Sequence, residues 1–347
     1  MLAQLGRAAL MPLRAPVWTA QLLTGTKSFE RNPVLGNRWL NEHGLHAGRV
    51  RLAHRVAETR RRRLTALVSA EDRAAFERDG FVIRPDFLPD DDFAALRRQI
   101  ESYRGTLREI SEGDTILRKI ALDPNTVAAM PALRRVLQNP EWRGLIRYIG
   151  SRDAEPVVWI QSILRHAQNG PPDPQTALHA DTFHPTVKAW LFLTDVAADG
   201  GPFTYVPGSH RLTPERLAWE RQMSLAAAGS HDREIRQGSF RIDPGELRAL
   251  GLPEPRVFAV PANTLIVADT FGFHARGPAA GRSVRVEIWA FGRRSPFAPW
   301  SAFDFWSGAA LARRSLLSWQ LGDFMERAGI KPHRWRARTG ISAFDPA

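Results

Sequence analysis

Residues 283–292 alternate strictly between two kinds of side chain. Aliphatic residues occupy every second position, and charged or aromatic residues the positions between: Val284, Val286, Ile288 and Ala290 in one set, Arg285, Glu287, Trp289 and Phe291 in the other. Successive side chains of a β-strand point to opposite faces of a sheet. The stretch therefore predicts a strand that buries an aliphatic face and presents polar and aromatic groups on the other.

Five further stretches have the composition of short strands, at residues 157–164, 187–194, 203–206, 256–260 and 264–268. Gly and Pro turns separate them, which is typical of an all-β sandwich or barrel. A shorter strand is predicted ahead of them at residues 81–83. The chain is thus expected to build a mainly β core.

Helices are predicted on both sides of these strands. Ser69 is a suitable N-cap for a helix that Gly80 would end. In the next helix, which begins at residue 90, Phe93, Leu96 and Ile100 share one face. Further helices are predicted near residues 125–138, 140–149 and 310–328, and a helical insertion at residues 212–250.

A candidate metal site begins at His179 and Asp181, which an extended backbone would point to the same face. His274, at the end of the sequence DTFGFH, would supply a third ligand from a distant strand. Two His and one carboxylate with open coordination positions form the facial triad of non-haem Fe(II) oxygenases. A single His-x-Asp also occurs in solvated loops, and a lone His is often a core residue. The surrounding sequence therefore carries the interpretation.

That surrounding sequence resembles a known family. The run LHADTFHPTVKAWLFLTD at residues 178–195 and the run GGPFTYVPGSH at residues 200–210 are similar to the phytanoyl-CoA dioxygenase family of Fe(II)/2-oxoglutarate oxygenases. The family's 2-oxoglutarate-binding Arg lies about eleven residues past the distal His, which is the position of Arg285 relative to His274. The resemblance covers roughly residues 70–295 and is most specific around the candidate metal ligands.

The resemblance implies a double-stranded β-helix, that is, a cupin-like jelly roll with flanking α-helices. It implies Fe(II), 2-oxoglutarate and O2 as cofactor and cosubstrates, with Arg285 on the distal carboxylate of 2-oxoglutarate and Lys119, Gln161 and Trp190 near it. A planar guanidinium suits a carboxylate, and Arg276 and Arg282 are alternative donors. His184 is interpreted as lying near the metal or the substrate, or as structural, and His210 as part of a turn.

The function expected from the resemblance is hydroxylation of an unactivated C–H bond in a small-molecule or lipid-like substrate, with release of succinate and CO2. Asp181 favours oxygen insertion or desaturation, because halogenating relatives lack this carboxylate. Two other functions stay open: a lipid-associated protein that kept the fold without turnover, and a metal enzyme on the same barrel that does not use 2-oxoglutarate.

The net charge of +12 is concentrated at the N-terminus. Residues 1–65 contain twelve Lys or Arg and three Glu, so they hold most of the surplus, and the whole domain is not expected to bind nucleic acid. Apolar residues within this segment make it either a basic helix that contacts an anionic membrane or a helix packed on the body. The Arg block at residues 60–63 is expected to be a solvated helix face or linker.

Three parts are therefore predicted: a basic amphipathic extension at residues 1–65, an oxygenase domain at residues 66–300, and a C-terminal helix with a basic tail at residues 301–347. A truncated protein beginning near Ser69 is predicted to keep the metal site, because every candidate ligand follows residue 100. The absence of cysteine excludes disulfides and thiolate metal sites. It agrees with a cytoplasmic location, with or without peripheral contact at the inner face of a membrane.

Overall fold

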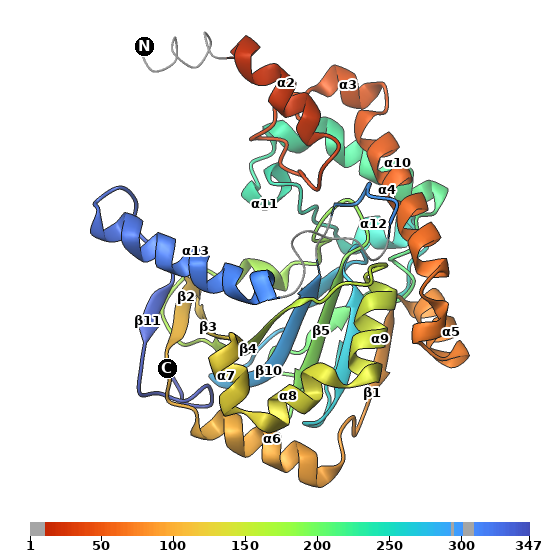
Figure 1. Ribbon diagram of the computed structural model, residues 1–347. Helices are drawn as coiled ribbons and strands as arrows, with labels where there is room; N and C mark the ends of the chain where they lie inside the picture. Colours follow the sequence, from red (N-terminus) through yellow and green to blue (C-terminus); the bar gives the residue numbers. More distant parts are fainter. Residues whose placement is uncertain (1–10, 293–294, 301–308) are drawn as a thin grey trace.

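The computed structural model describes residues 11–292, 295–300 and 309–347 (Figure 1). Its larger sheet is antiparallel and contains, in spatial order, β1 (Phe81–Arg84), β8 (Leu265–Asp269), β5 (Val187–Phe192), β10 (Ser283–Gly292), β4 (Val157–Arg165), β3 (Thr115–Ala121), β2 (Leu107–Glu112) and β11 (Arg336–Arg338). A smaller antiparallel sheet contains β7 (Arg256–Phe258), β6 (Phe203–Tyr205) and β9 (His274–Arg276). This is the predicted double-stranded β-helix.

The two faces of β10 differ as the alternation predicts. Val286, Ile288 and Ala290 are buried in a core that the outer helices cover. Those helices are α6 (Asp90–Ser102), α7 (Pro124–Ala129), α8 (Pro131–Gln138) and α9 (Pro140–Ile149), which lie over the sheet in Figure 1. The inner face of β10 instead lies toward the second sheet, where Trp190, Phe203 and Phe258 form a smaller core. The strand therefore separates the structural core from the interior of the barrel.

The predicted helix boundaries are confirmed at α5 (Ala70–Asp79). The Ser69 side chain accepts a hydrogen bond from the Asp72 backbone N–H, and Gly80 ends the helix in a left-handed conformation with a φ of 87°. The single helix predicted at residues 125–138 is wrong. It divides into α7 and α8 at Pro131, which has no N–H to donate to a preceding turn.

Three strands in the larger sheet, β2, β3 and β11, were not predicted. Charged residues interrupt the apolar alternation of β2 at Arg108 and Glu109, and that of β3 at Arg118 and Lys119. The basic tail predicted after the last helix is wrong in part. After α13 (Ala309–Arg327), β11 pairs with β2, and Ser342 and Ala343 beyond it are each only 1% exposed. The C-terminal residues complete an edge of the sheet.

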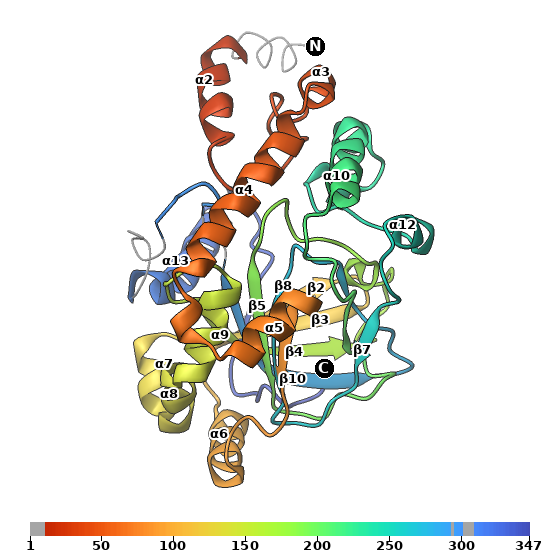
Figure 2. The ribbon, with the colours of Figure 1, turned by 90° about the vertical axis from the view of Figure 1, so that its right-hand side faces the viewer.

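The N-terminal segment is packed on the body. It contains α2 (Met11–Gln21), α3 (Arg38–Glu42) and α4 (Leu45–Arg62), and Figure 2 shows α4 running from α3 down to the level of α9. Val50 and Ala53 of α4 are fully buried in one cluster with Phe183 and Phe271. The prediction of a solvated Arg block is wrong at Arg60, which is 3% exposed. Between α4 and α5 lies a short 3-10 turn, Thr65–Leu67.

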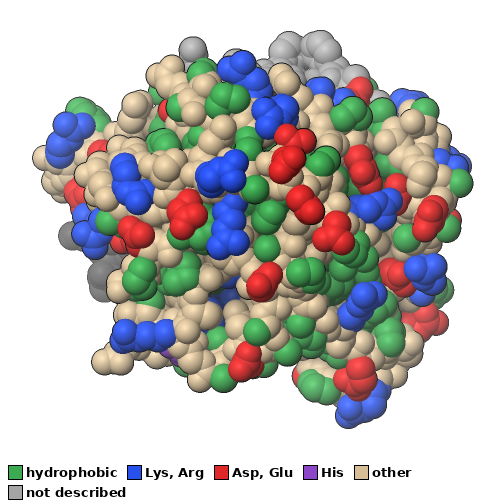
Figure 3. Space-filling view, turned by 90° about the horizontal axis from the view of Figure 1, so that it is seen from below, with side chains coloured by type: hydrophobic (Ala, Val, Ile, Leu, Met, Phe, Trp, Pro, Cys, Tyr) green, Lys and Arg blue, Asp and Glu red, His purple; other side chains and the backbone are tan. Residues whose placement is uncertain are grey.

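The insertion after β6 forms α10 (Pro214–Ala226), a 3-10 turn at Ala227–Gly229, α11 (Arg233–Arg236) and α12 (Pro244–Ala249). Helix α10 lies against α3 and α4. Seen from below, basic and acidic side chains are interspersed over the surface, so the positive surplus does not gather on that face (Figure 3). No helix in the described part of the chain is long and apolar enough to cross a bilayer.

Candidate active site

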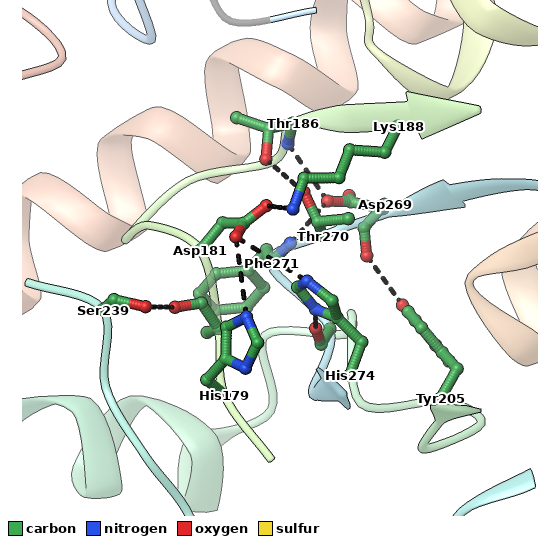
Figure 4. Close-up of polar contacts among 12 residues, drawn as sticks. His179, Asp181, Thr186, Lys188, Tyr205, Ser239, Asp269, Thr270, Phe271 and His274 are labelled. Atoms are coloured by element: carbon green, nitrogen blue, oxygen red, sulfur yellow. Dashed lines mark hydrogen bonds and ion pairs between the residues drawn. The ribbon is translucent and has the colours of Figure 1, made fainter. Parts of the chain in front are cut away.

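His179, Asp181 and His274 come together as the sequence predicts, with one potential ligand atom of each within 4.8 Å of the others. Asp181 Oδ1 lies 3.8 Å from His179 Nε2 and 3.7 Å from His274 Nε2 (Figure 4). The backbones of the two histidines exchange hydrogen bonds of 3.0 and 2.9 Å, which fixes their separation. His179 belongs to no longer strand, and isolated bridges to His274 and to Arg241 hold it in place.

The two imidazoles are oriented for metal binding. His179 Nδ1 lies 2.8 Å from the Ala177 carbonyl, and His274 Nδ1 lies 2.9 Å from the Gly272 carbonyl. When Nδ1 carries the proton for these bonds, Nε2 keeps its lone pair and points to the centre of the cluster. His274 Nε2 is buried and has no hydrogen-bond partner among the described residues. The residues present therefore fit a divalent metal ion.

The charge state of the cluster also suits a cation. Burial, and then His274, hold the pKa of His179 well below its usual value, so that its ring is neutral near pH 7. Burial by itself raises the pKa of Asp181, but Lys188 and then His274 outweigh it and hold that pKa well below its usual value. Lys188 Nζ lies 2.6 Å from Asp181 Oδ2. A neutral imidazole at His179 beside an ionised carboxylate at Asp181, with His274 as the third member, is a donor set for Fe(II).

A turn after β8 supports the cluster from behind. Asp269 Oδ1 accepts hydrogen bonds from the backbone N–H groups of Thr186 and Phe271, at 3.1 and 3.0 Å. The Asp181 backbone N–H donates to the Thr270 carbonyl at 3.0 Å, and Tyr205 Oη donates to the Asp269 carbonyl at 2.8 Å (Figure 4). The backbone of Asp181 is thereby fixed to the segment that leads to His274.

The insertion and the N-terminal segment hold the same turn. Arg216 of α10 donates to the carbonyls of Ser209 and Phe271 at 3.0 and 3.1 Å and pairs with Glu220 at 3.1 Å. Glu220 also lies 3.1 Å from His46 Nε2 of α4, and all three ionisable side chains are almost fully buried. Two elements outside the sheets therefore hold the turn that carries the distal histidine.

The metal cluster opens into a cavity of about 320 Å³. The cavity is lined by the other residues predicted at the site, together with several that sequence reasoning missed: Arg285, Gln161, Trp190 and Lys119 among the former, and Lys27, Glu112, Lys188, Trp289 and Phe291 among the latter. Lys27 Nζ lies 2.6 Å from the Asp181 carbonyl oxygen. No signal in the sequence links a lysine of the N-terminal segment to this site.

Arg285 is 6% exposed and lies on the inner face of β10, as predicted. Its Nε lies 3.0 Å from Glu287 Oε2, and its Nη1 donates to the Gly201 carbonyl. Gln161 Nε2 donates to Glu287 Oε1 at 2.8 Å, so the buried Glu287 joins two of the predicted residues. Trp190 packs on Phe203, with ring centroids 4.3 Å apart.

The alternative arginines occupy other environments. Arg276 lines the cavity and pairs with Asp173, which also binds Arg165, so a buried carboxylate already engages it. Arg282 is exposed and immediately precedes β10. Arg285 is therefore the better placed of the three arginines for a ligand carboxylate.

Lys119 lies over an aromatic surface. Its Nζ lies 4.2 Å and 4.3 Å from the ring centroids of Trp159 and Trp289, which are stacked, and 5.5 Å from that of Trp335. Burial, offset in part by Glu112, lowers its pKa to about 7. Trp335, which follows α13, thus brings the C-terminal part of the chain to this wall of the barrel.

His184 and His210, the two other histidines considered from the sequence, lie away from the metal cluster. His184 is 2% exposed, contacts the Phe183 ring and does not line the cavity within the part of the chain that the structure describes. His210 packs on Phe76, with ring centroids 5.1 Å apart, close to Gly80. Neither faces the metal cluster, which favours the structural interpretation of His184.

A model of the phytanoyl-CoA dioxygenase (PhyH) family matches residues 76–249. Ectoine dioxygenase of Halomonas elongata is 29% identical over 165 residues, which cover 42% of this chain and 47% of that protein. The chain thus spans about half the length of this curated relative.

The chain is also similar to several solved structures, two of which are SnoN and HygX. The non-haem α-ketoglutarate-dependent epimerase SnoN from nogalamycin biosynthesis has a TM-score of 0.44 and 21% identity, with 65% of this chain and 82% of that chain covered. HygX from Streptomyces hygroscopicus, with nickel and 2-oxoglutarate bound, has a TM-score of 0.39 and 17% identity, with 65% and 86% covered. The family match spans half of the sequence and includes His179 and Asp181, so the chain belongs to the phytanoyl-CoA dioxygenase family.

Proposed function

We propose that the protein is an Fe(II)- and 2-oxoglutarate-dependent dioxygenase that hydroxylates an unactivated C–H bond of a small molecule. Substrate, 2-oxoglutarate and O2 would be converted to hydroxylated product, succinate and CO2. The observation that carries the proposal is the buried cluster of His179, Asp181 and His274 at the base of a cavity that also contains Arg285. Membership of the phytanoyl-CoA dioxygenase family supports the same reaction class.

His179, Asp181 and His274 would hold the iron through Nε2, a carboxylate oxygen and Nε2. Iron with 2-oxoglutarate and O2 supplies the oxidising chemistry, and the protein positions and shields it. The backbone carbonyls that engage each Nδ1 keep the rings in one tautomer and orientation. The chain thus contributes a rigid donor set with open positions on the cavity side.

Arg285 would bind the distal carboxylate of 2-oxoglutarate. Glu287 at Nε and the Gly201 carbonyl at Nη1 hold the guanidinium in one orientation, so little side-chain freedom is lost on binding. Lys119, Gln161 and Trp190 line the same cavity and would complete the cosubstrate site. A cavity of about 320 Å³ suits a small-molecule ligand better than a macromolecule.

Succinate formation by purified protein with Fe(II) and 2-oxoglutarate tests the proposal, because such oxygenases turn over 2-oxoglutarate slowly without substrate. We expect succinate from the wild type and none from Asp181→Ala. Arg285→Ala should need far more 2-oxoglutarate, whereas Arg282→Ala, an exposed arginine three residues earlier, should behave as wild type. Iron binding without succinate formation would favour the metal enzyme that does not use 2-oxoglutarate. Absence of both iron binding and succinate formation would favour the non-catalytic protein.

A lipid-like substrate, a cytoplasmic location and contact of residues 1–65 with a membrane stay predictions. Exposed apolar residues in this segment include Leu23 and Trp39, at 71% and 61% exposure, beside exposed arginines such as Arg38. Such a surface would be attracted to anionic lipid. If the full-length protein fails to sediment with anionic vesicles at low salt, the membrane contact is excluded.

A further inference from the structure

A second cavity, of about 690 Å³, lies between α4, α5, α9 and the turn that follows β6. It shares no lining residue with the cavity of the metal cluster. Asp269, the last residue of β8, lines this second cavity, and its carboxylate accepts hydrogen bonds from the turn that supports the metal cluster. The second cavity is therefore separate from the first and has no part in the proposed oxygenase reaction.

The lining of this second cavity is strongly basic. It contains six arginines and three carboxylates: Arg51, Arg55, Arg61, Arg62, Arg73 and Arg211, with Glu58, Glu77 and Asp269. The excess of positive charge does not extend over the whole protein, because charges of both signs are interspersed on the face seen from below in Figure 3. The cavity is thus a local concentration of guanidinium groups in a concave surface.

Three of these arginines already have partners. Arg61 donates to the carbonyls of Tyr148 and Ile149 and lies 3.7 Å from Asp269 Oδ2. Arg62 pairs with Glu58 one turn earlier. Arg73 donates to the carbonyls of Thr65 and Val68, both at 3.0 Å.

The other three arginines, Arg51, Arg55 and Arg211, have no acidic partner within 4.0 Å among the described residues, and all three are exposed. Arg51 and Arg55 are four residues apart on α4, so they share one helix face and repel each other. Arg211 reaches the same cavity from the turn after β6, and its side chain makes a long hydrogen bond, of 3.4 Å, to the Gly208 carbonyl. This arrangement raises the local potential, since none of these three groups forms an ion pair with a carboxylate among the described residues.

We propose that this cavity binds the phosphate group of a small soluble ligand through Arg51, Arg55 and Arg211. Guanidinium groups present planar pairs of donors that match phosphate oxygens. Three unpaired cations match a phosphate dianion or a pyrophosphate better than a single carboxylate. The concave shape favours a soluble ligand over a flat lipid surface.

The test uses full-length, metal-free protein and inorganic pyrophosphate as the probe, with binding measured by calorimetric titration in the presence of saturating 2-oxoglutarate. We expect saturable binding that weakens as salt is raised. The triple variant Arg51→Ala, Arg55→Ala, Arg211→Ala should lose at least tenfold in affinity. Because these side chains are exposed and lack acidic partners, the variant should melt at the wild-type temperature.

The matched control removes the same charge elsewhere, with Arg98→Ala, Arg233→Ala and Arg248→Ala, three exposed arginines outside the cavity. Its affinity for pyrophosphate should equal that of the wild type. Absence of saturable binding, or an equal loss in both triple variants, would overturn the proposal. Binding of phosphatidic acid vesicles through Arg51, Arg55 and Arg211 without binding of pyrophosphate would also overturn it, in favour of a lipid headgroup.

Discussion

Helix α4 and the interior of the barrel both bury cationic side chains, which serve different purposes in the two regions. In α4, Arg49 donates to the carbonyls of Leu22, Thr24 and Thr26, at 2.9, 3.1 and 2.8 Å. In the barrel, Arg285 and Lys119 instead face a carboxylate, aromatic rings and the cavity.

The difference lies in the partners. The backbone carbonyls around α4 are neutral and fixed, so they use the donors of each arginine and leave little for a ligand. Arg60 shows the same pattern, with Nε 2.9 Å from the Ser151 carbonyl and Nη1 2.7 Å from the Ala298 carbonyl. The barrel cations adjoin open space and can engage an anion. Buried positive charge therefore indicates a ligand site only where the surrounding structure leaves donors unused.

The largest effect is expected from removing the N-terminal region. A truncated protein that begins at Ser69 loses Leu35 and Val50, both fully buried, which contribute about 1.5–3 kcal/mol each. It also loses Lys27 beside Asp181 and His46 beside Glu220. These contacts lead us to expect insoluble or iron-free protein, contrary to the prediction from sequence that the oxygenase domain stands alone. Soluble expression and Fe(II) titration against full-length protein test this, and a folded, iron-binding truncation would favour the independent domain.

Loss of the metal site without loss of the fold is the next largest effect. His179→Ala, Asp181→Ala and His274→Ala should each abolish Fe(II) binding, because the donor set has three members. His184→Ala is the matched control, since it removes a buried histidine outside the cavity. Metal titration and thermal melting measure both properties. Near wild-type iron affinity in any of the three variants would remove that residue from the site.

Substituting one buried arginine from each region should separate the effect on stability from the effect on 2-oxoglutarate binding. Arg60→Leu leaves buried carbonyls without donors and should lower the free energy of unfolding by on the order of 3 kcal/mol. It should not change 2-oxoglutarate affinity. Arg285→Ala with Glu287→Gln, which avoids an unpaired buried carboxylate, should weaken 2-oxoglutarate binding roughly a hundredfold, for about 2–3 kcal/mol lost with a charge-assisted contact.

Urea unfolding and 2-oxoglutarate titration of both proteins, with Glu287→Gln alone as the control, give the two readouts. The comparison between the regions fails if Arg60→Leu weakens 2-oxoglutarate binding as strongly as the Arg285 variant does.

The last effect concerns pH, since Lys119 can lose its proton near neutrality and the arginines cannot. Its pKa is about 7 in the folded protein and near 10.5 in the unfolded chain, so the unfolded state binds more protons between these values. The Lys119 contribution therefore makes the apoprotein more stable as pH rises from 7 toward 10.5, and changes little below 7. Lys119→Met should flatten this rise, and Lys331→Met, at an exposed lysine, should not. The free energy of unfolding of the wild type and both variants, measured with urea at pH 7 and pH 9.5, tests this prediction.

Local patterns were sufficient to predict much of the fold. The alternating stretch at residues 283–292 has the same bounds as β10. Ser69 and Gly80 mark the beginning and the end of α5. These signals depend on neighbouring residues along the chain, through side-chain direction in a strand and backbone geometry at helix ends. By contrast, β2 and β3 could not be predicted, because their charged side chains are accepted only where partners from other strands lie beside them.

The sequence by itself determined the candidate metal ligands, since a His-x-Asp pair and a distal His can be recognised in the printed residues. Only the tertiary structure decided which positive charges are buried, which segments complete the site and which cations stay unpaired. Lys27 meets Asp181, and His46 meets Glu220, across more than a hundred residues of chain. The physical reason is that burying a charge is tolerable only with a partner in place, and that partner is supplied by folding.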